Sequence, residues 1–134
     1  MNLIKFQNYP STETPLNAEN LNHNFNELNK ANTYSTEEQV IGTWIDGKKI
    51  YRKVVTGIIT TANTKINLAH DNIINISGKI LGNNGGNNEL IYYYDNTNYS
   101  YVYSQNYSTL MLLTVESNLN KNYYAIIEYT KTTE

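Results

Sequence analysis

The chain has 134 residues, a formal net charge of −2 and no cysteine. This length suits one compact domain with at most a small appended element, and the lack of cysteine excludes disulfides and thiolate metal sites. Only 16% of the residues are charged, which argues against a nucleic-acid partner, because nucleic-acid-binding surfaces concentrate Lys and Arg.

Residues 1–13 are expected to form an extended N-terminal arm. They carry a short apolar patch, Leu3, Ile4 and Phe6, followed by Pro10 and polar turn residues. An arm this short cannot bury its own apolar side chains, so we predict that it docks on another protein; a frayed terminus is the alternative. No signal-peptide h-region and no apolar run of roughly 18 residues occurs, so we expect neither a cleaved signal nor a membrane partner.

Residues 14–33 are predicted to form a helix. Thr14 followed by Pro15 suits the N-cap and first-turn positions, with Asn17 as an alternative cap. One narrow apolar stripe follows at heptad spacing, and the other faces are polar: Ala18, Leu21, Phe25 and Leu28. A helix of about 15 residues is marginal alone in water, so either the β domain or copies of the chain must cover the stripe. The narrow seam favours self-association.

From Val40 onward the apolar pattern changes to period two. Val40–Ile45 and Lys49–Ile59 flank Asp46-Gly47, which is a strong β-hairpin signal. We expect the pair Trp44-Ile45 to meet the pair Ile50-Tyr51 across this hairpin. Four basic residues fall at the turn and just after it: Lys48, Lys49, Arg52 and Lys53. We interpret them as a solvated edge that discourages aggregation, with a ligand-binding patch as the alternative.

Further strands are predicted at intervals marked by Asn, Gly and Asp: Lys65–Ala69, Asn72–Leu81, Glu89–Tyr94, Tyr99–Ser104, Thr109–Glu116 and Tyr123–Thr130. Leu110–Leu113 is apolar on both faces and indicates a central buried strand, while Gly78 suggests a bulge. Seven or eight short strands predict a mainly β protein, in which residues 34–134 fold as an antiparallel, jelly-roll-like β-sandwich.

The sequence offers no catalytic or metal-binding pattern. We interpret His23 as a solvated side chain of the helix and His70, next to Asp71, as a turn residue. A catalytic serine or cysteine needs a histidine beside it, and no zinc-protease, phosphate-loop, dinucleotide or EF-hand spacing occurs. We therefore expect no enzyme, no metal and no cofactor.

Tyrosine is the most conspicuous surface chemistry, with 13 residues in the chain. Tyr92 and Tyr94 share one face of a predicted strand, and Tyr99, Tyr101 and Tyr103 share one face of the next. Tyrosine rings stack on sugar C–H surfaces, and their hydroxyls exchange hydrogen bonds with sugars. These five residues are candidate glycan-binding positions; packing in the sandwich or at a subunit interface is the alternative.

Three segments together resemble a known group of proteins. "TPLNAENLN" (14–22) resembles a helix-opening motif in tail, baseplate and fibre proteins of phages of low-GC Gram-positive and gut bacteria. "YSTEEQVIGTWIDGKKIYRKVV" (34–55) and "YYAIIEYTKTTE" (123–134) are similar to the start and last strand of the C-terminal β domain of such phage fibre proteins. The family often has Pro where Lys49 stands here, and its fibres are usually much longer.

The resemblance implies a virion structural protein, commonly a homotrimer, whose β head serves attachment or decoration. We therefore expect a short phage fibre, made in the host cytoplasm and carried on the virion. Its arm would anchor it through Leu3, Ile4 and Phe6 to another phage structural protein, and its head would meet host cell-surface polysaccharide. The alternatives are a dimer, a head or neck fibre or decoration protein without a receptor, and a monomeric carbohydrate-binding module.

Overall fold

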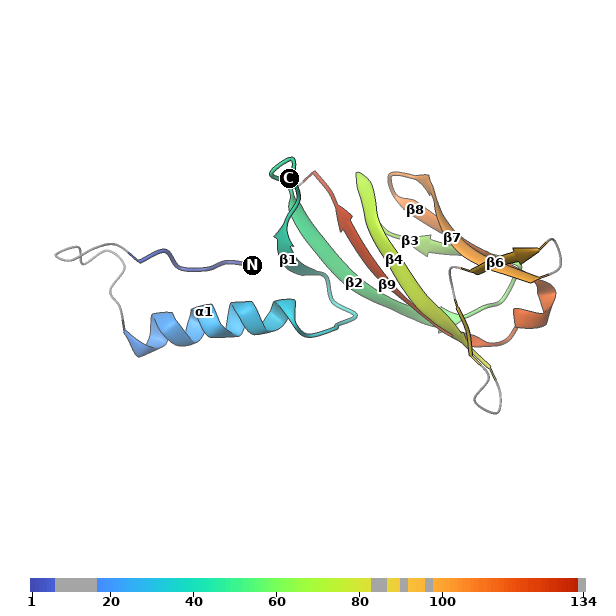
Figure 1. The fold of residues 1–134 in the computed structure, drawn as a ribbon, viewed down its shortest axis with the longest axis horizontal. Coiled ribbons are helices and arrows are strands. Elements are labelled where there is room, and N and C mark those ends of the chain that lie inside the picture. The colour runs from blue at the N-terminus through green and yellow to red at the C-terminus, as the bar shows by residue number, and fades with distance from the viewer. Residues whose placement is uncertain (7–16, 83–86, 90–91, 96–97, 133–134) are drawn as a thin grey trace.

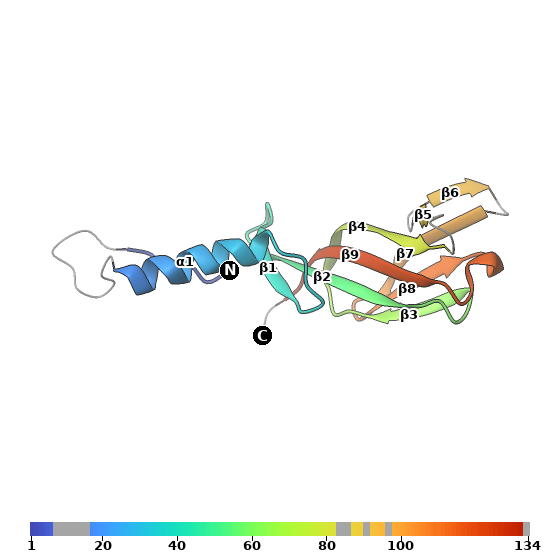
Figure 2. The ribbon, with the colours of Figure 1, turned by 90° about the horizontal axis from the view of Figure 1, so that it is seen from below.

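The computed structural model describes residues 1–6, 17–82, 87–89, 92–95 and 98–132, with the backbone alone for 87–89, 92–95 and 98. One helix precedes two antiparallel sheets that pack face to face (Figure 1). The predicted mainly β fold, a short N-terminal helix followed by an antiparallel β-sandwich, is confirmed. Figure 2 shows the helix and the sandwich in line along the longest axis of the molecule.

The helix α1 spans Ala18–Ala31. Its N-cap is Asn17, whose side-chain oxygen accepts a hydrogen bond of 2.9 Å from the backbone N–H of Asn20. This cap satisfies one of the donors left free in the first turn. The alternative cap predicted from the sequence is therefore confirmed, whereas Thr14 and Pro15 lie outside the described residues.

The larger sheet has the order β1-β2-β9-β4-β5. Its strands are β1 Gln39–Thr43, β2 Lys49–Ile58, β9 Asn122–Thr130, β4 Asn72–Leu81 and β5 Asn87–Glu89. The smaller sheet has the order β3-β8-β7-β6, with β3 Asn63–Asn67, β8 Thr109–Thr114, β7 Asn98–Asn106 and β6 Tyr92–Asp95. A short 3₁₀ turn, η2 (Glu116–Asn118), leads from β8 to β9. The chain passes between the sheets after β2, β3, β5 and β8.

The core lies between the sheets and follows the alternation of the strands. On β9, every second side chain from Tyr123 to Tyr129 is buried, and the intervening ones are half-buried. On β8, Leu110 and Leu112 are fully buried, whereas Met111 and Leu113 are half-buried. β8 is thus the predicted central strand, but its outer face is only partly covered. Each fully buried Ile or Leu contributes about 1.5–3 kcal/mol relative to its exposure to water.

The β1–β2 hairpin forms where Asp46-Gly47 predicts it, but its pairing differs from the expectation. The backbone N–H of Trp44 donates to the carbonyl of Lys48 at 2.8 Å, and the N–H of Gly47 donates to the carbonyl of Trp44 at 2.9 Å. Gly47 has φ +85°, so the loop has three residues and ends in a glycine bulge. Consequently Ile50 lies opposite Gly42 rather than Trp44, and Ile45 is 92% exposed at the tip.

The prediction of a bulge at Gly78 is wrong in position. The register between β4 and β9 shifts between Ile73 and Asn75, while Gly78 pairs regularly with Ala125. Gly78 is needed for a different reason: its φ is +156°, and a Cβ there would lie 2.1 Å from the carbonyl oxygen of Tyr124. Only glycine allows β4 to approach β9 this closely.

The described residues form nine strands, because the segment predicted as one strand, Glu89–Tyr94, contributes to two short strands, β5 and β6. β5 ends at Glu89 in the larger sheet, and β6 begins at Tyr92 in the smaller one. The chain therefore changes sheets inside this segment. An alternation pattern cannot reveal such a crossing, because both strands have the same period.

Candidate functional site

The apolar stripe of α1 is left open to solvent by its own chain. Phe25 is 63% exposed and Leu28 is 45% exposed, while Leu21 is half-buried and Ala18 is exposed. The helix meets the sandwich only near its C-terminal end, where it contacts β1. A short helix with an uncovered apolar stripe is unfavourable in water. The stripe is therefore the clearest candidate for an interaction surface.

The first six residues lie along another side of α1 (Figure 1). The backbone N–H of Asn2 donates to Glu27 Oε2 at 2.8 Å, and that of Ile4 donates to Asn24 Oδ1 at 2.6 Å. In return Asn24 Nδ2 donates to the carbonyl of Ile4 at 2.9 Å, and His23 Nε2 contacts the carbonyl of Asn2 at 2.6 Å. His23 therefore helps to hold the arm. The polar face of the helix binds the arm backbone, and Phe25 and Leu28 of the stripe stay exposed.

The arm leaves apolar side chains exposed. Leu3 is 43% exposed and Phe6 is 37% exposed, whereas Ile4 is half-buried. These are the residues for which the sequence predicts a docking role on a virion partner. That role stays a prediction, and the structure adds that the arm is supported by its own helix.

Glu27 is the polar centre of the contact between arm and helix. Its carboxylate accepts hydrogen bonds from the Lys30 ammonium and from the backbone N–H of Asn2. These two hydrogen bonds, that from Lys30 first, lower the pKa of Glu27 from 4.5 to about 2. The carboxylate is therefore ionised at neutral pH, as the contact with the arm requires.

Arg52 attaches the helix to the sandwich. Arg52 is only 8% exposed, and its Nη2 donates to the carbonyls of Ala31 at 2.5 Å and Thr33 at 3.1 Å. The guanidinium lies 4.4 Å from the ring centroid of Tyr34 and 4.0 Å from Glu128. A cation that bonds the last carbonyls of a helix also complements the helix dipole.

The interpretation of the basic cluster as a solvated edge is therefore wrong for Arg52. β2 lies between β1 and β9 rather than at the edge of the sheet, and the outward side chain of Arg52 is covered by the chain that follows the helix. Lys48 is exposed but paired, since its Nζ lies 2.9 Å from Asp71 Oδ2. This hydrogen bond raises the pKa of Lys48 and lowers the pKa of Asp71.

A second polar contact ties β1 to β9. The Tyr129 hydroxyl and the Lys131 ammonium both donate to the carboxylate of Glu38. Burial opposes ionisation of Glu38, but the hydrogen bonds from Lys131 and Tyr129 outweigh it and lower its pKa. Burial first, and then this hydrogen bond, raise the pKa of Tyr129. The ring of Tyr129 stacks on Tyr51 at a centroid distance of 5.9 Å.

Three of the five candidate glycan-binding tyrosines form a ladder on β7. The ring centroids of Tyr99 and Tyr101 are 6.2 Å apart, those of Tyr101 and Tyr103 are 6.0 Å apart, and both pairs are tilted by 43°. Ser100 and Val102 alternate with them and face the core, so the ladder lies on the outer face of the smaller sheet. Tyr103 is 40% exposed, and the other two rings are half-buried.

The other two candidate tyrosines, Tyr92 and Tyr94, lie in β6. Their side chains are outside the described residues. The backbone register pairs Tyr92 with Ser100 and Tyr93 with Tyr99. Tyr93 is thus the residue of β6 directly opposite the ladder.

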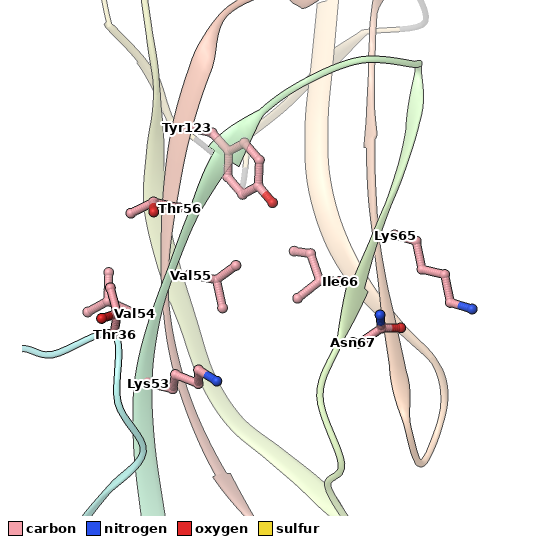
Figure 3. A pocket seen from close by; sticks show the side chains of 9 residues that line it. All are labelled: Thr36, Lys53, Val54, Val55, Thr56, Lys65, Ile66, Asn67 and Tyr123. Carbon is pink, nitrogen blue, oxygen red and sulfur yellow. The ribbon is translucent and has the colours of Figure 1, made fainter.

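A cleft of about 380 Å³ opens along one flank of the sandwich. Val55 and Tyr123 point into it from the larger sheet, and Ile66 points into it from β3 (Figure 3). β1 pairs with β2 only over Lys49–Arg52. Beyond this pairing, the backbone N–H of Val54 donates to the carbonyl of Ser35 at 2.8 Å, and Thr36 helps to line the cleft. Burial raises the pKa of the Tyr123 hydroxyl. The cleft is lined by both apolar and polar side chains. A lining of this kind suits the binding of a side chain or a small ligand.

His70 is a buried structural residue rather than an exposed turn residue. It is 3% exposed, and its Nδ1 lies 2.8 Å from the carbonyl of Leu68. Since a carbonyl only accepts hydrogen bonds, Nδ1 carries a proton, and Nε2 lies 2.8 Å from Ser104 Oγ. Asp71 Oδ2 accepts from Lys48 and Thr132 instead. The imidazole therefore ties the segment before β4 to β7.

The described part of the chain contains no group of three His, Asp or Glu side chains placed to bind a metal ion. None of its helices has the length and hydropathy needed to cross a membrane. Comparison with protein families, with curated proteins and with solved structures gives no match to the chain. The fold and the contacts above are thus the basis for a functional proposal.

Proposed function

We propose that the protein is a short, fibre-like structural protein of a phage virion, in which three chains associate through α1 and present their β-sandwiches outward. The observation that carries this proposal is the exposure of Phe25 and Leu28, next to the half-buried Leu21, on a helix that extends away from the sandwich. A side chain such as Phe or Leu gains about 1.5–3 kcal/mol when it is fully buried. Copies of the same helix are the simplest cover for a narrow apolar seam.

The joint at Arg52 supports the same proposal. A helix that served only as a flexible linker would not need a buried guanidinium bonded to the carbonyls of Ala31 and Thr33. These hydrogen bonds fix the orientation of the helix relative to the head, and a fibre requires a fixed orientation. The arm, supported by Glu27 and Asn24, holds Leu3 and Phe6 near the helix for a virion partner.

The mass of the protein in solution tests the assembly. Light scattering on the purified full chain should give about 46 kDa, three times the 15.4 kDa of one chain. A mass of one chain at every concentration would contradict the proposal, and a mass of two chains would replace the trimer by a dimer.

A role in host attachment is favoured by the ladder of Tyr99, Tyr101 and Tyr103, because adjacent rings on an outer sheet face suit the stacking of sugar rings. Titration with host cell-surface polysaccharide, followed by tyrosine fluorescence, should show binding that Tyr103→Ala weakens. Trimers that bind no polysaccharide would favour a head or neck decoration protein, and monomers that bind would favour a carbohydrate-binding module.

A further inference from the structure

The outer face of the larger sheet, on the side away from the smaller sheet, carries an unusual set of apolar side chains. Val54 lies opposite Ile126, and Tyr124 lies opposite Thr56. Their neighbours in sequence, such as Val55 and Ala125, face the core, so these residues point outward. A sheet face that meets water normally carries polar residues at such alternate positions. We call Val54, Ile58, Leu81, Tyr124 and Ile126 the sheet stripe.

The far end of the sheet stripe is open and hollowed. Ile58 is 55% exposed and Leu81 is 37% exposed. Together with Tyr124 they line a hollow of about 360 Å³. Its volume is large enough to receive side chains from a facing surface. Exposed apolar side chains around a concave surface favour a protein contact.

The helix is attached to the same face of the sheet. Arg52 is two residues before Val54 on β2 and points outward with it, and its guanidinium holds the carbonyls of Ala31 and Thr33. In Figure 1 the larger sheet lies between the helix and the smaller sheet. The larger sheet is therefore the part of the head that lies nearest to the helix, and its outer face continues from the helix end.

We infer that the sheet stripe is a second contact between copies of this chain, which continues the helix contact into the head. This inference rests on the proposed self-association through α1. The occupant of the face is the larger sheet of a neighbouring copy. Arg52 and Glu128 lie 4.0 Å apart at the helix end of the stripe, so their opposite charges compensate each other where the heads meet.

The test is the association of full-length variants measured by sedimentation equilibrium. The double variant Ile58→Glu/Leu81→Glu places charges in the hollow and should weaken association tenfold or more. The matched control is Tyr107→Glu, because Tyr107 is 78% exposed but lies in the turn between β7 and β8 of the smaller sheet. The control should associate like the unchanged chain. Near-UV circular dichroism checks that each sandwich is folded.

If the double variant does not fold, the same contact can be tested on the unchanged chain by methyl NMR. With ¹³C-labelled methyl groups, the NMR signals of Ile58 and Leu81 should shift when the assembly is diluted to single chains. The signal of Ile45, which is 92% exposed at the hairpin tip, should not shift.

The outcomes separate this inference from the proposed function. If Phe25→Glu dissociates the assembly while Ile58→Glu/Leu81→Glu leaves it intact and the two methyl signals stay in place, the helix alone joins the chains and the inference is wrong. If the unchanged chain is monomeric at all concentrations, the proposed function itself is wrong, and the inference fails with it.

Discussion

At the scale of single residues, Gly78 shows how one missing side chain permits a close strand contact. In Gly78→Ala the new Cβ would lie 2.1 Å from the Tyr124 carbonyl oxygen, at a φ of +156°. We expect a loss of about 2–4 kcal/mol in the free energy of unfolding, measured by urea denaturation. The control is Gly42→Ala, where the nearest atom is Ile50 Cδ1 at 3.9 Å. Equal stability of the two variants would contradict this account.

Glu27 makes the docking of the arm dependent on pH. Its pKa is about 2 in the folded chain against 4.5 without these contacts. Because the folded-state pKa is lowered, the stabilisation is complete above pH 4.5 and is lost as the pH falls towards about 2. Hydrogen exchange at the backbone N–H groups of Asn2 and Ile4 should become faster over this range, relative to amides of β9.

The control for this prediction is Glu27→Gln, which keeps the shape of the side chain but cannot ionise. In this variant the two amides should exchange faster than in the unchanged chain already at neutral pH, and they should show no added acceleration between pH 4.5 and about 2. An identical pH profile in both proteins would mean that another carboxylate holds the arm.

At the scale of elements, α1 is the element that we propose other copies of the chain to cover. Phe25→Glu should weaken association of the full chain by more than tenfold, because each copy loses the burial of one aromatic side chain, about 2–3 kcal/mol. Sedimentation velocity measures the change. Asn26→Glu is the matched control, since Asn26 is an exposed residue next to Phe25 in the same helix but on a polar face. Equal weakening by both would point to helix propensity or charge rather than the stripe.

The joint between α1 and β2 gives a second prediction at this scale. In Arg52, Nη2 bonds the carbonyls of Ala31 and Thr33 while Nη1 lies 4.0 Å from Glu128. In Arg52→Lys, one ammonium cannot make all of these contacts and also replace the planar guanidinium over the Tyr34 ring. We expect a loss of about 1–3 kcal/mol in the free energy of unfolding and faster hydrogen exchange in the last turn of α1. Lys53→Arg, at the next position on the other face of β2, should change neither quantity.

The sequence predicts elements better than it predicts their contacts. β4 was expected over Asn72–Leu81 and is observed there, because a run rich in Ile and bounded by turn residues favours a strand even where a bulge interrupts its alternation. The burial of Arg52 and His70 was not expected, because their partners are carbonyls and a hydroxyl brought together by packing of distant segments. The sequence did not predict which residues pair across the hairpin, because an Asp-Gly dipeptide occurs in loops of two and of three residues. A loop longer by one residue shifts the pairing of the two strands by one position.

Of the two candidate interaction surfaces, the sequence predicts the one on α1 but not the sheet stripe. The exposure of Phe25 and Leu28 was foreseeable, because their spacing leaves every other face of the helix polar. The sheet stripe was not, since the alternation of β2 and β9 does not tell which of two apolar faces meets the smaller sheet. Val54 and Val55 look alike in sequence, and only the sandwich distinguishes them.

At the scale of the whole molecule, association and folding should be linked. If copies bind one another only when folded, the assembly stabilises the native chain by mass action. The midpoint of thermal unfolding should then rise by roughly 2–5 °C for each tenfold rise in protein concentration. Differential scanning calorimetry at several concentrations measures this. Phe25→Glu should unfold at a midpoint that does not depend on concentration, and a constant midpoint for the unchanged chain would contradict the link.

The position of β9 also governs the order of events during synthesis. It is the last strand of the described residues, yet it lies between β2 and β4 and pairs with both along most of their length. While the ribosome is still making Asn122–Thr130, β2 and β4 have unpaired edges and no link to each other. The head is therefore completed late, from pairings between distant segments that form slowly. A nascent chain that stalls before residue 122 would expose the unpaired edges of β2 and β4 to chaperones and proteases.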